Sequence, residues 1–242
     1  MNSFGDTHIG QKRSINQDYI FYSDLPVGTL PNLYIVADGM GGHRAGDKAS
    51  SFAVKDFIER IKNAETEHPL VAMRNAIEKV NEEIYALSTT IPEYEGMGTT
   101  FVAATVLDEC IYIMNIGDSR LYILKDGLKQ ITMDHSLVEE LVRNGQLTKE
   151  EAAKHPQKNV ITRALGVDNK VRPDFFEIEP EEMEMMILCS DGLTNMVNDK
   201  TIEYVLKNAK TLEKATEVLI GLANDNGGLD NISVVIVKRE ER

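Results

Sequence analysis

Residues 33–41 read LYIVADGMG, an apolar run that ends at an aspartate and continues into glycines. An aspartate also borders three other strongly apolar segments: Asp118 follows IYIMNIG, Asp191 follows MMILCS, and Asp230 lies just before ISVVIV. Short apolar runs of this kind are typical of buried strands. A carboxylate at the end of a buried strand is unfavourable unless its charge is compensated. Four such carboxylates, the first being Asp38, therefore suggest one shared cation.

If strand pairing brings these carboxylates to one edge, they form an all-oxygen pocket suited to Mg²⁺ or Mn²⁺. Two such ions held by a bridging carboxylate can acidify a shared water and orient it for attack on phosphorus. No protein nucleophile is then required, and the chain has no GxSxG elbow and no cysteine or histidine spacing typical of a zinc site. Each Asp-Gly or Asp-Asn pair alone is better explained as a turn. Together they favour a metal-dependent hydrolase.

Composition narrows the classes of partner. The chain has 242 residues, of which 42% are apolar and 27% charged, and it is long enough to bury a substantial core. Its 26 basic and 39 acidic residues give a formal charge of −13, which opposes binding to nucleic acid or anionic lipid. No apolar stretch has the length of a signal peptide or a membrane span, so we expect a cytoplasmic protein. Cys110 and Cys189 are expected to be buried free thiols.

Periodicity predicts the order of the elements. Helices are expected at 47–63, 69–87, 199–208 and 211–224, with short polar helices inside 134–166. Strands are expected at 16–23, 33–37, 99–107, 110–116, 120–124, 128–132, 174–178, 183–190 and 232–238, the four between 99 and 132 as an antiparallel meander. Strands and helices come in blocks and do not alternate, which disfavours a doubly wound parallel sheet. The predicted class is α+β, with antiparallel sheets covered by helix pairs.

The motifs of the chain resemble, in order, those of a known family. They are GQKRSINQD at 10–18, ADGMGGHRAG at 37–46, GTTFVAA at 98–104, IGDSRLY at 116–122, CSDGL at 189–193 and DNISVVIV at 230–237. The chain is similar to bacterial members of the PPM family, the metal-dependent type 2C protein serine/threonine phosphatases. The motifs span nearly the whole chain, so the resemblance implies a single domain over 1–242 with a four-layer α-β-β-α sandwich and a centre of two Mn²⁺ or Mg²⁺ ions.

The resemblance also implies roles for individual residues. Asp38 would bridge the two ions, the Gly39 carbonyl, Asp191 and Asp230 would complete the coordination, and Asp18 would hold metal-bound water. Asp118 would, with Asp191, hold a third and weaker ion. Arg13, which alone would be one more surface arginine, would bind the substrate phosphate, and Asn231 would support the site.

One position departs from the pattern of many eukaryotic relatives. Those relatives have DGHGG, whose histidine is the proposed general acid, whereas this chain has Met40. A thioether cannot donate a proton at neutral pH. The leaving group would then be protonated by metal-bound water, which we favour, or by another residue such as His43, or would need no proton. Gln17 also replaces a carboxylate of those relatives, which weakens one contact to water.

Residues 134–166, which begin with Asp134, His135 and Ser136, match the bacterial flap, which would lie beside the active site and gate protein substrates. The leading expectation is a monomeric enzyme that acts on phosphorylated serine and threonine in proteins and opposes a bacterial eukaryote-like kinase. Two alternatives remain: a pseudophosphatase that binds phosphoproteins without hydrolysis, and a phosphatase dedicated to one partner-switching antagonist. The presence of Asp38, Asp191 and Asp230 disfavours the first, and the absence of a fused sensor domain disfavours the second.

Overall fold

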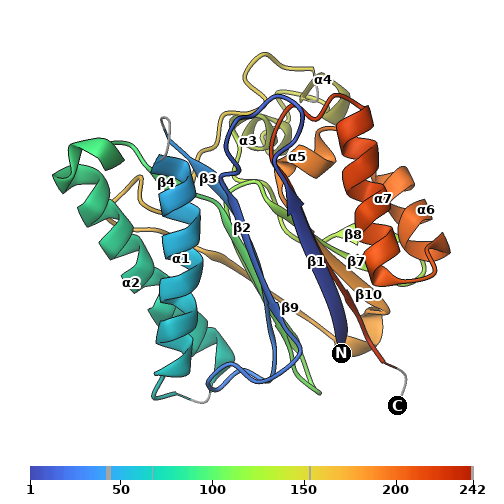
Figure 1. Cartoon of the computed structure of the whole chain (residues 1–242), viewed down its shortest axis with the longest axis horizontal. Coiled ribbons are helices and arrows are strands. Elements are labelled where there is room, and N and C mark those ends of the chain that lie inside the picture. Colours follow the sequence, from blue (N-terminus) through green and yellow to red (C-terminus); the bar gives the residue numbers. More distant parts are fainter. Residues whose placement is uncertain (42–44, 67, 153, 241–242) are drawn as a thin grey trace.

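Two antiparallel β-sheets stack face to face, and helices cover the outer face of each sheet (Figure 1). The computed structural model describes residues 1–41, 45–66, 68–152 and 154–240. Sheet A has the strand order β1 (Asn2–His8), β11 (Ile232–Lys238), β10 (Met185–Cys189), β7 (Arg120–Leu124) and β8 (Leu128–Gln130). Sheet B has the order β2 (Asp18–Ser23), β3 (Leu33–Met40), β5 (Phe101–Val106), β6 (Ile111–Ile116) and β9 (Asp174–Ile178), with the short β4 (Gly98–Thr99) paired to β3.

The helices form the two outer layers. Sheet B is covered by α1 (Ala45–Lys62) and α2 (Pro69–Thr90), and sheet A by α5 (Asp191–Thr194), α6 (Asp199–Asn208) and α7 (Leu212–Asp225). The short α3 (Leu137–Arg143) and α4 (Lys149–Ala152) belong to the segment at one end of the sandwich, away from both termini (Figure 1). Two 3₁₀ turns, Pro92–Tyr94 and Pro180–Glu182, complete the described elements. The predicted α+β sandwich of four layers is confirmed.

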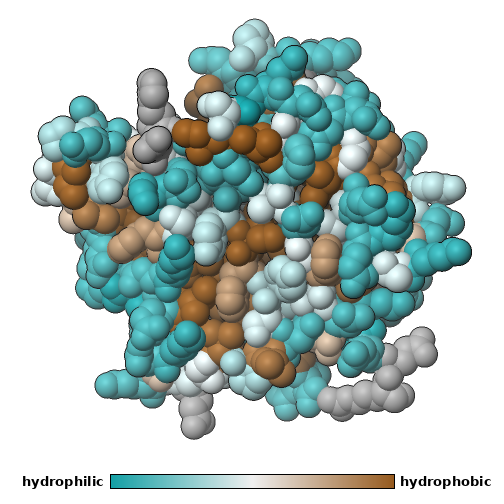
Figure 2. Space-filling model, viewed as in Figure 1, coloured by the Kyte–Doolittle hydropathy of each residue, from teal (hydrophilic) through white to brown (hydrophobic). Residues whose placement is uncertain are grey.

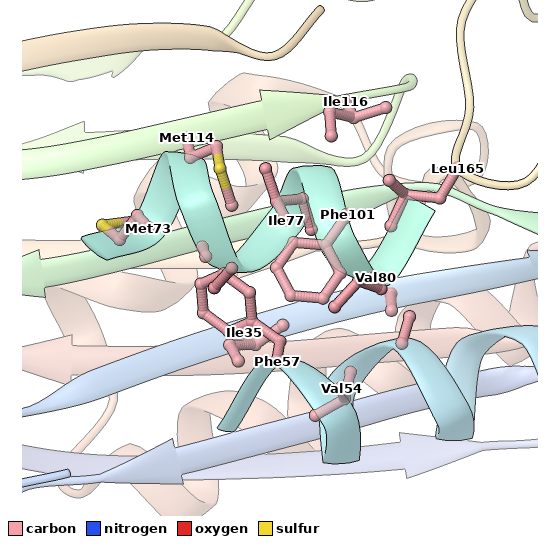
Figure 3. Close-up of a cluster of buried hydrophobic side chains, with 14 of the residues drawn as sticks. Ile35, Val54, Phe57, Met73, Ile77, Val80, Phe101, Met114, Ile116 and Leu165 are labelled. Atoms are coloured by element: carbon pink, nitrogen blue, oxygen red, sulfur yellow. The ribbon is translucent and has the colours of Figure 1, made fainter. Parts of the chain in front are cut away.

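Side-chain alternation along the strands explains the layering. In β3, Leu33 and Ile35 face the helices, whereas Tyr34 and Val36 face the other sheet, and all four are fully buried. Such a strand reads as a continuous apolar run because both of its faces are covered. Figure 3 shows the helix side of this arrangement, where Phe57 of α1 packs against Phe101 of β5 with ring centroids 5.0 Å apart.

The same alternation continues through sheet A. In β11, Val234 and Ile236 face α5–α7, and Val235 and Val237 face sheet B. The chain therefore has three hydrophobic layers: between α1–α2 and sheet B, between the sheets, and between sheet A and α5–α7. Hydrophilic residues surround separate hydrophobic patches on the face drawn in Figure 2, as the charge of −13 leads one to expect.

Two expectations about the strands were wrong. The segment 99–132 is not one meander, because β5 and β6 pair in sheet B whereas β7 and β8 pair in sheet A. The chain crosses between the sheets at residues 117–119, where Gly117 has a φ of 103° that favours glycine. The strand β1 was not predicted, because NSFGDTH has a single large apolar residue. β1 nevertheless pairs with β11 along its whole length.

The remaining differences concern local boundaries. The strand at 33–37 extends through Asp38 to Met40 because β4 pairs with its end. Cys189 is a buried free thiol as predicted, but Cys110 is free and only half-buried. In the described residues no helix is both long and apolar enough to span a bilayer.

Candidate metal centre

The aspartates at the strand ends lie at one end of the sandwich. Asp38 is near the end of β3, Asp118 is in the crossover from β6 to β7, and Asp191 is the first residue of α5, two residues after the end of β10. Asp230 lies two residues before β11. Their mutual electrostatic interactions show that the fold brings them together: the pKa of Asp38 is raised well above its usual value, first by burial and then by neighbouring carboxylates, namely Asp18, Asp191, Asp118 and Asp230.

The backbone of Asp38 is held by hydroxyl groups of the next strands. Its N–H donates to Thr100 Oγ1 at 2.9 Å, and its carbonyl accepts from Thr99 Oγ1 at 2.9 Å and from the Thr100 N–H at 2.9 Å. Thr100 Oγ1 also lies 2.8 Å from Ser119 Oγ, next to Asp118. Thr99, Thr100 and Ser119 are buried, and the backbone N–H and carbonyl of Asp38 both have partners, which fixes where the Asp38 side chain leaves the sheet.

Gly39 is required by a close approach of two backbone segments. A Cβ atom at this position would lie 2.1 Å from the carbonyl oxygen of Gly46 and 2.6 Å from that of Gln17. The Gly39 N–H donates to the Gln17 carbonyl at 3.0 Å, and Ser50 Oγ donates to the same carbonyl at 2.6 Å. The start of α1 and the segment before β2 therefore pack directly against the end of β3.

Asp18 is buried, and only one of its carboxylate oxygens is satisfied. Oδ2 accepts from Ser190 Oγ at 2.8 Å and from Ser233 Oγ at 2.7 Å. Oδ1 is buried and has no hydrogen-bond partner among the described residues. Burial raises the pKa of Asp18 to about 7, and the two serine hydroxyls oppose that rise. Because a buried carboxylate oxygen without a partner is costly, Oδ1 is suited to a cationic environment.

Asp191 and Asp118 share the same environment. Asp191 Oδ2 accepts from Asn195 Nδ2 at 2.9 Å, but its Oδ1 is buried without a partner in the described structure. Burial and the charge of Asp230 raise the pKa of Asp191, while the positive charges of Arg120 and Arg13 oppose that rise. Burial and the negative charges of Asp191 and Asp134 raise the pKa of Asp118 to about 7. Like charges this close require a proton or a cation between them.

Arg13 forms an ion pair with Asp230. Its Nη2 lies 2.7 Å from Asp230 Oδ2, and both side chains are partly exposed. Asn231 holds the segment that carries Arg13: its Nδ2 donates to the carbonyls of Ile9 and Ile15 at 2.9 and 3.0 Å, and its Oδ1 accepts the Gln17 N–H at 2.8 Å. Asn231 thus shapes the loop between β1 and β2 and positions the guanidinium beside the carboxylates.

The residues fit divalent metal ions in number and chemistry. Several acidic side chains meet at one end of the fold, two of their oxygens are buried without partners, and Gly39 keeps a backbone carbonyl beside them. In the described part of the chain, no three acidic, histidine or cysteine side chains already surround a common point as ligands would. Asp230 is instead neutralised by Arg13. Coordination would therefore require rotation of these side chains.

We call residues 134–166 the flap. The first residues of the flap are anchored to the crossover between β6 and β7, beside Asp118. Asp134 accepts from Arg120 Nε at 3.0 Å and from Arg120 Nη2 at 2.7 Å. His135 Nδ1 accepts the Gly117 N–H at 3.0 Å, and Nε2 therefore carries the proton and donates to Asp174 Oδ2 at 3.1 Å. Ser136 caps α3 by accepting the Glu139 N–H at 3.3 Å. These three residues thus anchor the flap and do not lie at its tip.

A cavity of about 390 Å³ separates the flap from the carboxylates. Asp118, Asp191 and Asn195 line it on the side of the sandwich, and Val138 and Lys158 line it on the side of the flap. This cavity is continuous with the acidic centre. It is large enough to admit side chains that flank a phosphorylated residue.

Met40 occupies the position of the proposed general acid of eukaryotic relatives, and histidines are the side chains that could replace it. Met40 ends β3 and is half-buried beside Gly98, where a Cβ atom would lie 2.8 Å from the Met40 Cε. His43 lies outside the described residues. The other four histidines are the buried His135 of the flap anchor and His8, His68 and His155, which are partly or fully exposed.

Several residues that hold the site were not singled out from the sequence. They are Thr7, Thr99, Thr100, Ser119, Ser190 and Ser233, whose hydrogen bonds connect segments far apart along the chain, and Asn195, which bonds to Asp191 within the same turn. The available signal was a hydroxyl residue directly beside a strand-end aspartate, as in Asp118-Ser119 and Ser190-Asp191. Such pairs are common in turns, so the signal alone is weak.

Comparison with known proteins identifies the family of this chain. A family model described as protein phosphatase 2C matches residues 4–224. The chain therefore belongs to the protein phosphatase 2C family, and it is a serine/threonine phosphoprotein phosphatase of a class that depends on metal ions.

Two bacterial phosphatases illustrate the similarity. The chain is 46% identical, over 215 residues that cover 86% of it and 84% of the relative, to the serine/threonine phosphatase stp of Listeria monocytogenes. It is 40% identical, over 241 residues that cover 97% of it and 96% of the relative, to the protein phosphatase PhpP of Streptococcus pneumoniae.

Solved structures share the fold. The crystal structure of the serine/threonine phosphatase Stp1 from Staphylococcus aureus aligns with a TM-score of 0.91 at 36% identity and covers 99% of this chain and 95% of that one. The catalytic domain of the phosphatase PstP, in complex with two manganese ions, aligns with a TM-score of 0.85 at 32% identity and covers 98% and 97% of the two chains.

Proposed function

We propose that this phosphatase hydrolyses phosphoserine and phosphothreonine in proteins at a centre of two Mn²⁺ or Mg²⁺ ions held by Asp38, the Gly39 carbonyl, Asp191 and Asp230. The observation that carries this proposal is the position of Asp38, which lies opposite Asp18 in the pairing of β2 with β3 and within electrostatic range of Asp191, Asp118 and Asp230. Asp18 contributes its free Oδ1 to the same centre. Asp118, together with Asp191, offers a place for a third, weaker ion.

The two ions, when bound, would acidify a water molecule for attack on phosphorus and neutralise the phosphoryl oxygens. The chain itself binds and orients the substrate. Arg13 lies beside Asp230 on a loop that Asn231 fixes, and its planar guanidinium can hold a phosphate through two parallel hydrogen bonds. Asp38 and Asp191 lie within electrostatic range of each other, so a bound cation would neutralise both carboxylates. Met40 offers no proton.

The flap supports a preference for protein substrates. It is anchored at its base by Asp134, His135 and Ser136 and forms one wall of the cavity beside Asp118 and Asp191. A phosphorylated segment that enters the cavity would contact Val138 and Lys158 of the flap, whereas a small aryl phosphate would reach only the acidic centre. The natural opponent of such an enzyme is a protein serine/threonine kinase.

Phosphate release from a phosphothreonine peptide tests the proposal. The wild-type protein, Asp191→Asn and the exposed control Asp126→Asn are compared with Mn²⁺ and after chelation. We expect turnover that requires Mn²⁺, is retained by Asp126→Asn and is abolished by Asp191→Asn. A folded, metal-loaded wild-type protein that binds the peptide without releasing phosphate would instead identify a pseudophosphatase. Turnover of only one phosphoprotein would indicate a dedicated antagonist.

A further inference from the structure

A closed ring of hydrogen bonds starts and ends on Asp18. The Asp18 N–H donates to Asn16 Oδ1 at 3.2 Å, and Asn16 Nδ2 donates to Thr7 Oγ1 at 2.9 Å. Thr7 Oγ1 lies 2.7 Å from Ser233 Oγ, which donates to Asp18 Oδ2 at 2.7 Å. The ring joins β1, the segment before β2, β11 and the first residue of β2. It therefore fastens both sheets to the Asp18 carboxylate.

When Asp18 is ionised, as a metal ligand has to be, the direction of every hydrogen bond in this ring is determined. A backbone N–H can only donate, so the amide oxygen of Asn16 must face Asp18 and its NH₂ group must face Thr7. Thr7 Oγ1 then accepts from Asn16, and the single proton of Ser233 Oγ is given to Asp18. The bond between the two hydroxyls must therefore run from Thr7 to Ser233. The donors therefore follow one another in the same direction round the ring, and the last of them, Ser233 Oγ, donates to Asp18 Oδ2.

A second serine, Ser190, also donates a hydrogen bond to Asp18 Oδ2. Ser190 Oγ accepts the Ser233 N–H at 3.0 Å and donates to Asp18 Oδ2 at 2.8 Å. Ser190 and Ser233 are fully buried. Oδ2 thus receives two hydroxyl donors while Oδ1, also buried, receives none among the described residues. Rotation of the Asp18 carboxylate away from this orientation, short of a half-turn, would carry its oxygens out of reach of both hydroxyls and leave these donors without a good acceptor.

We propose that Thr7 is a positioning residue which, through Ser233, turns the Asp18 carboxylate so that Oδ2 is saturated and Oδ1 stays free for the metal centre. Thr7 itself touches neither the substrate nor the ions. It acts by orienting the Ser233 hydroxyl, because consecutive hydrogen bonds in a buried chain polarise and strengthen one another. This inference rests on the proposed function, since it assigns Asp18 to the metal centre.

Isosteric substitutions separate positioning from packing. Thr7→Val keeps the shape and the β-branch but removes the hydroxyl, and Thr7→Ser keeps the hydroxyl. Thr216→Val is the control, since the buried hydroxyl of Thr216 has no hydrogen-bond partner in the described structure. Mn²⁺ binding to each full-length protein is measured by isothermal titration calorimetry, the melting temperature is measured in chelator, and kcat and KM are measured on a phosphothreonine peptide.

We expect Thr7→Val to raise the Mn²⁺ dissociation constant about 3- to 10-fold and to lower kcat with little change in KM, as loss of one partly buried hydrogen bond implies. Thr7→Ser and Thr216→Val should bind Mn²⁺ like the wild type. Ser233→Ala, which removes the direct donor, should have a larger effect than Thr7→Val.

Unchanged Mn²⁺ affinity and kcat in Thr7→Val, with an active wild type, would overturn the role of Thr7 alone. A lower melting temperature at unchanged Mn²⁺ affinity would likewise show that Thr7 only packs. A wild-type protein that binds no Mn²⁺ would overturn the proposed function and this inference together.

Discussion

Asp18 lies directly opposite Asp38 in the antiparallel pairing of β2 with β3. Two like charges at facing positions of neighbouring strands destabilise a sheet, and here both are also buried enough for their pKa values to be raised. A fold that keeps such a pair in place has to neutralise it, by protonation or by a bound cation. Stability and metal binding are therefore linked at this position.

The first prediction concerns the stability of the metal-free protein against pH. The pKa of Asp18 in the folded state is about 7, above its value in an unfolded chain, so the folded protein binds this proton more tightly. The contribution of Asp18 to the free energy of unfolding is therefore greatest at low pH. This contribution to the free energy of unfolding falls as the pH rises from about 4 through 7. In chelator we expect the wild type to melt at a lower temperature at pH 8 than at pH 5.5.

Asp38→Asn checks the origin of that effect. The substitution removes one charge from the group, so it should stabilise the metal-free protein at pH 8 by about 1–3 kcal/mol. It should also abolish the stabilisation that Mn²⁺ gives the wild type. The exposed Asp126→Asn serves as the control in the same thermal unfolding experiments. If Asp38→Asn and Asp126→Asn behaved alike at both pH values, the carboxylates would not be electrostatically linked.

The second prediction concerns Gly39. In Gly39→Ala the new Cβ atom would meet the carbonyl oxygen of Gly46 at 2.1 Å, so the end of β3 must move away from the start of α1. We expect a loss of about 2–4 kcal/mol in the free energy of unfolding, measured in urea, and at least a 100-fold loss of phosphatase activity.

Gly221→Ala is the matched control for that experiment. Gly221 lies in α7 with open space around it, so alanine there should stabilise the protein by up to about 1 kcal/mol and leave activity unchanged. An active, stable Gly39→Ala protein would show that the close approach is not needed.

The third prediction concerns Met40. Replacing it with histidine places a titratable donor beside Asp38 and Gly39 at the end of β3. We expect Met40→His to change the pH dependence of kcat more than the Mn²⁺ dissociation constant, since the imidazole can supply a proton. Rate profiles between pH 6 and 9 and calorimetric titration with Mn²⁺ provide the two readings. Identical pH profiles would contradict the prediction.

The fourth prediction concerns the flap, whose two ends lie side by side. The Leu137 N–H donates to the Val160 carbonyl at 2.9 Å, and Ser136 pairs with Ile161. Residues 138–159 can therefore be replaced by a short glycine linker while the anchors Asp134, His135 and Ser136 are kept. We expect turnover of a phosphoprotein to fall at least tenfold and turnover of a small aryl phosphate to change less than threefold. Equal losses on both substrates would show that the flap does not gate proteins.

Local patterns predicted most elements because they depend on neighbouring residues. The bounds of β11 at Ile232–Lys238 and α6 at Asp199–Asn208 follow from an apolar run and a helical spacing that tertiary contacts do not alter. The strand β1 was missed because its pairing with β11, and not its own residues, makes it a strand. The crossover at Gly117 was missed for a similar reason, since a turn signal does not reveal which sheet the next strand joins.

In the candidate site, too, local sequence predicted some features, whereas contacts between distant segments were missed. The strand-end aspartates were found because an acid beside an apolar run is unusual, and the structure brings them together. The ion pair of Arg13 with Asp230 and the ring that runs through Thr7 and Ser233 were not foreseen. Both connect residues more than two hundred positions apart, for which one sequence offers no local signal.

The pairing of β1 with β11 also has a consequence for synthesis on the ribosome. Asn2 pairs with Lys238 and His8 with Ile232, so the first strand emerges long before its partner exists. Asp230 and the Ser233 hydroxyl arrive with that late partner. A nascent chain that ends before β11 would carry β1 as an unpaired edge, exposed to chaperones and to other chains, and would lack a complete centre. The phosphatase would gain its activity only after β11 has been synthesised, so a chain that ends before β11 could not dephosphorylate the proteins around it.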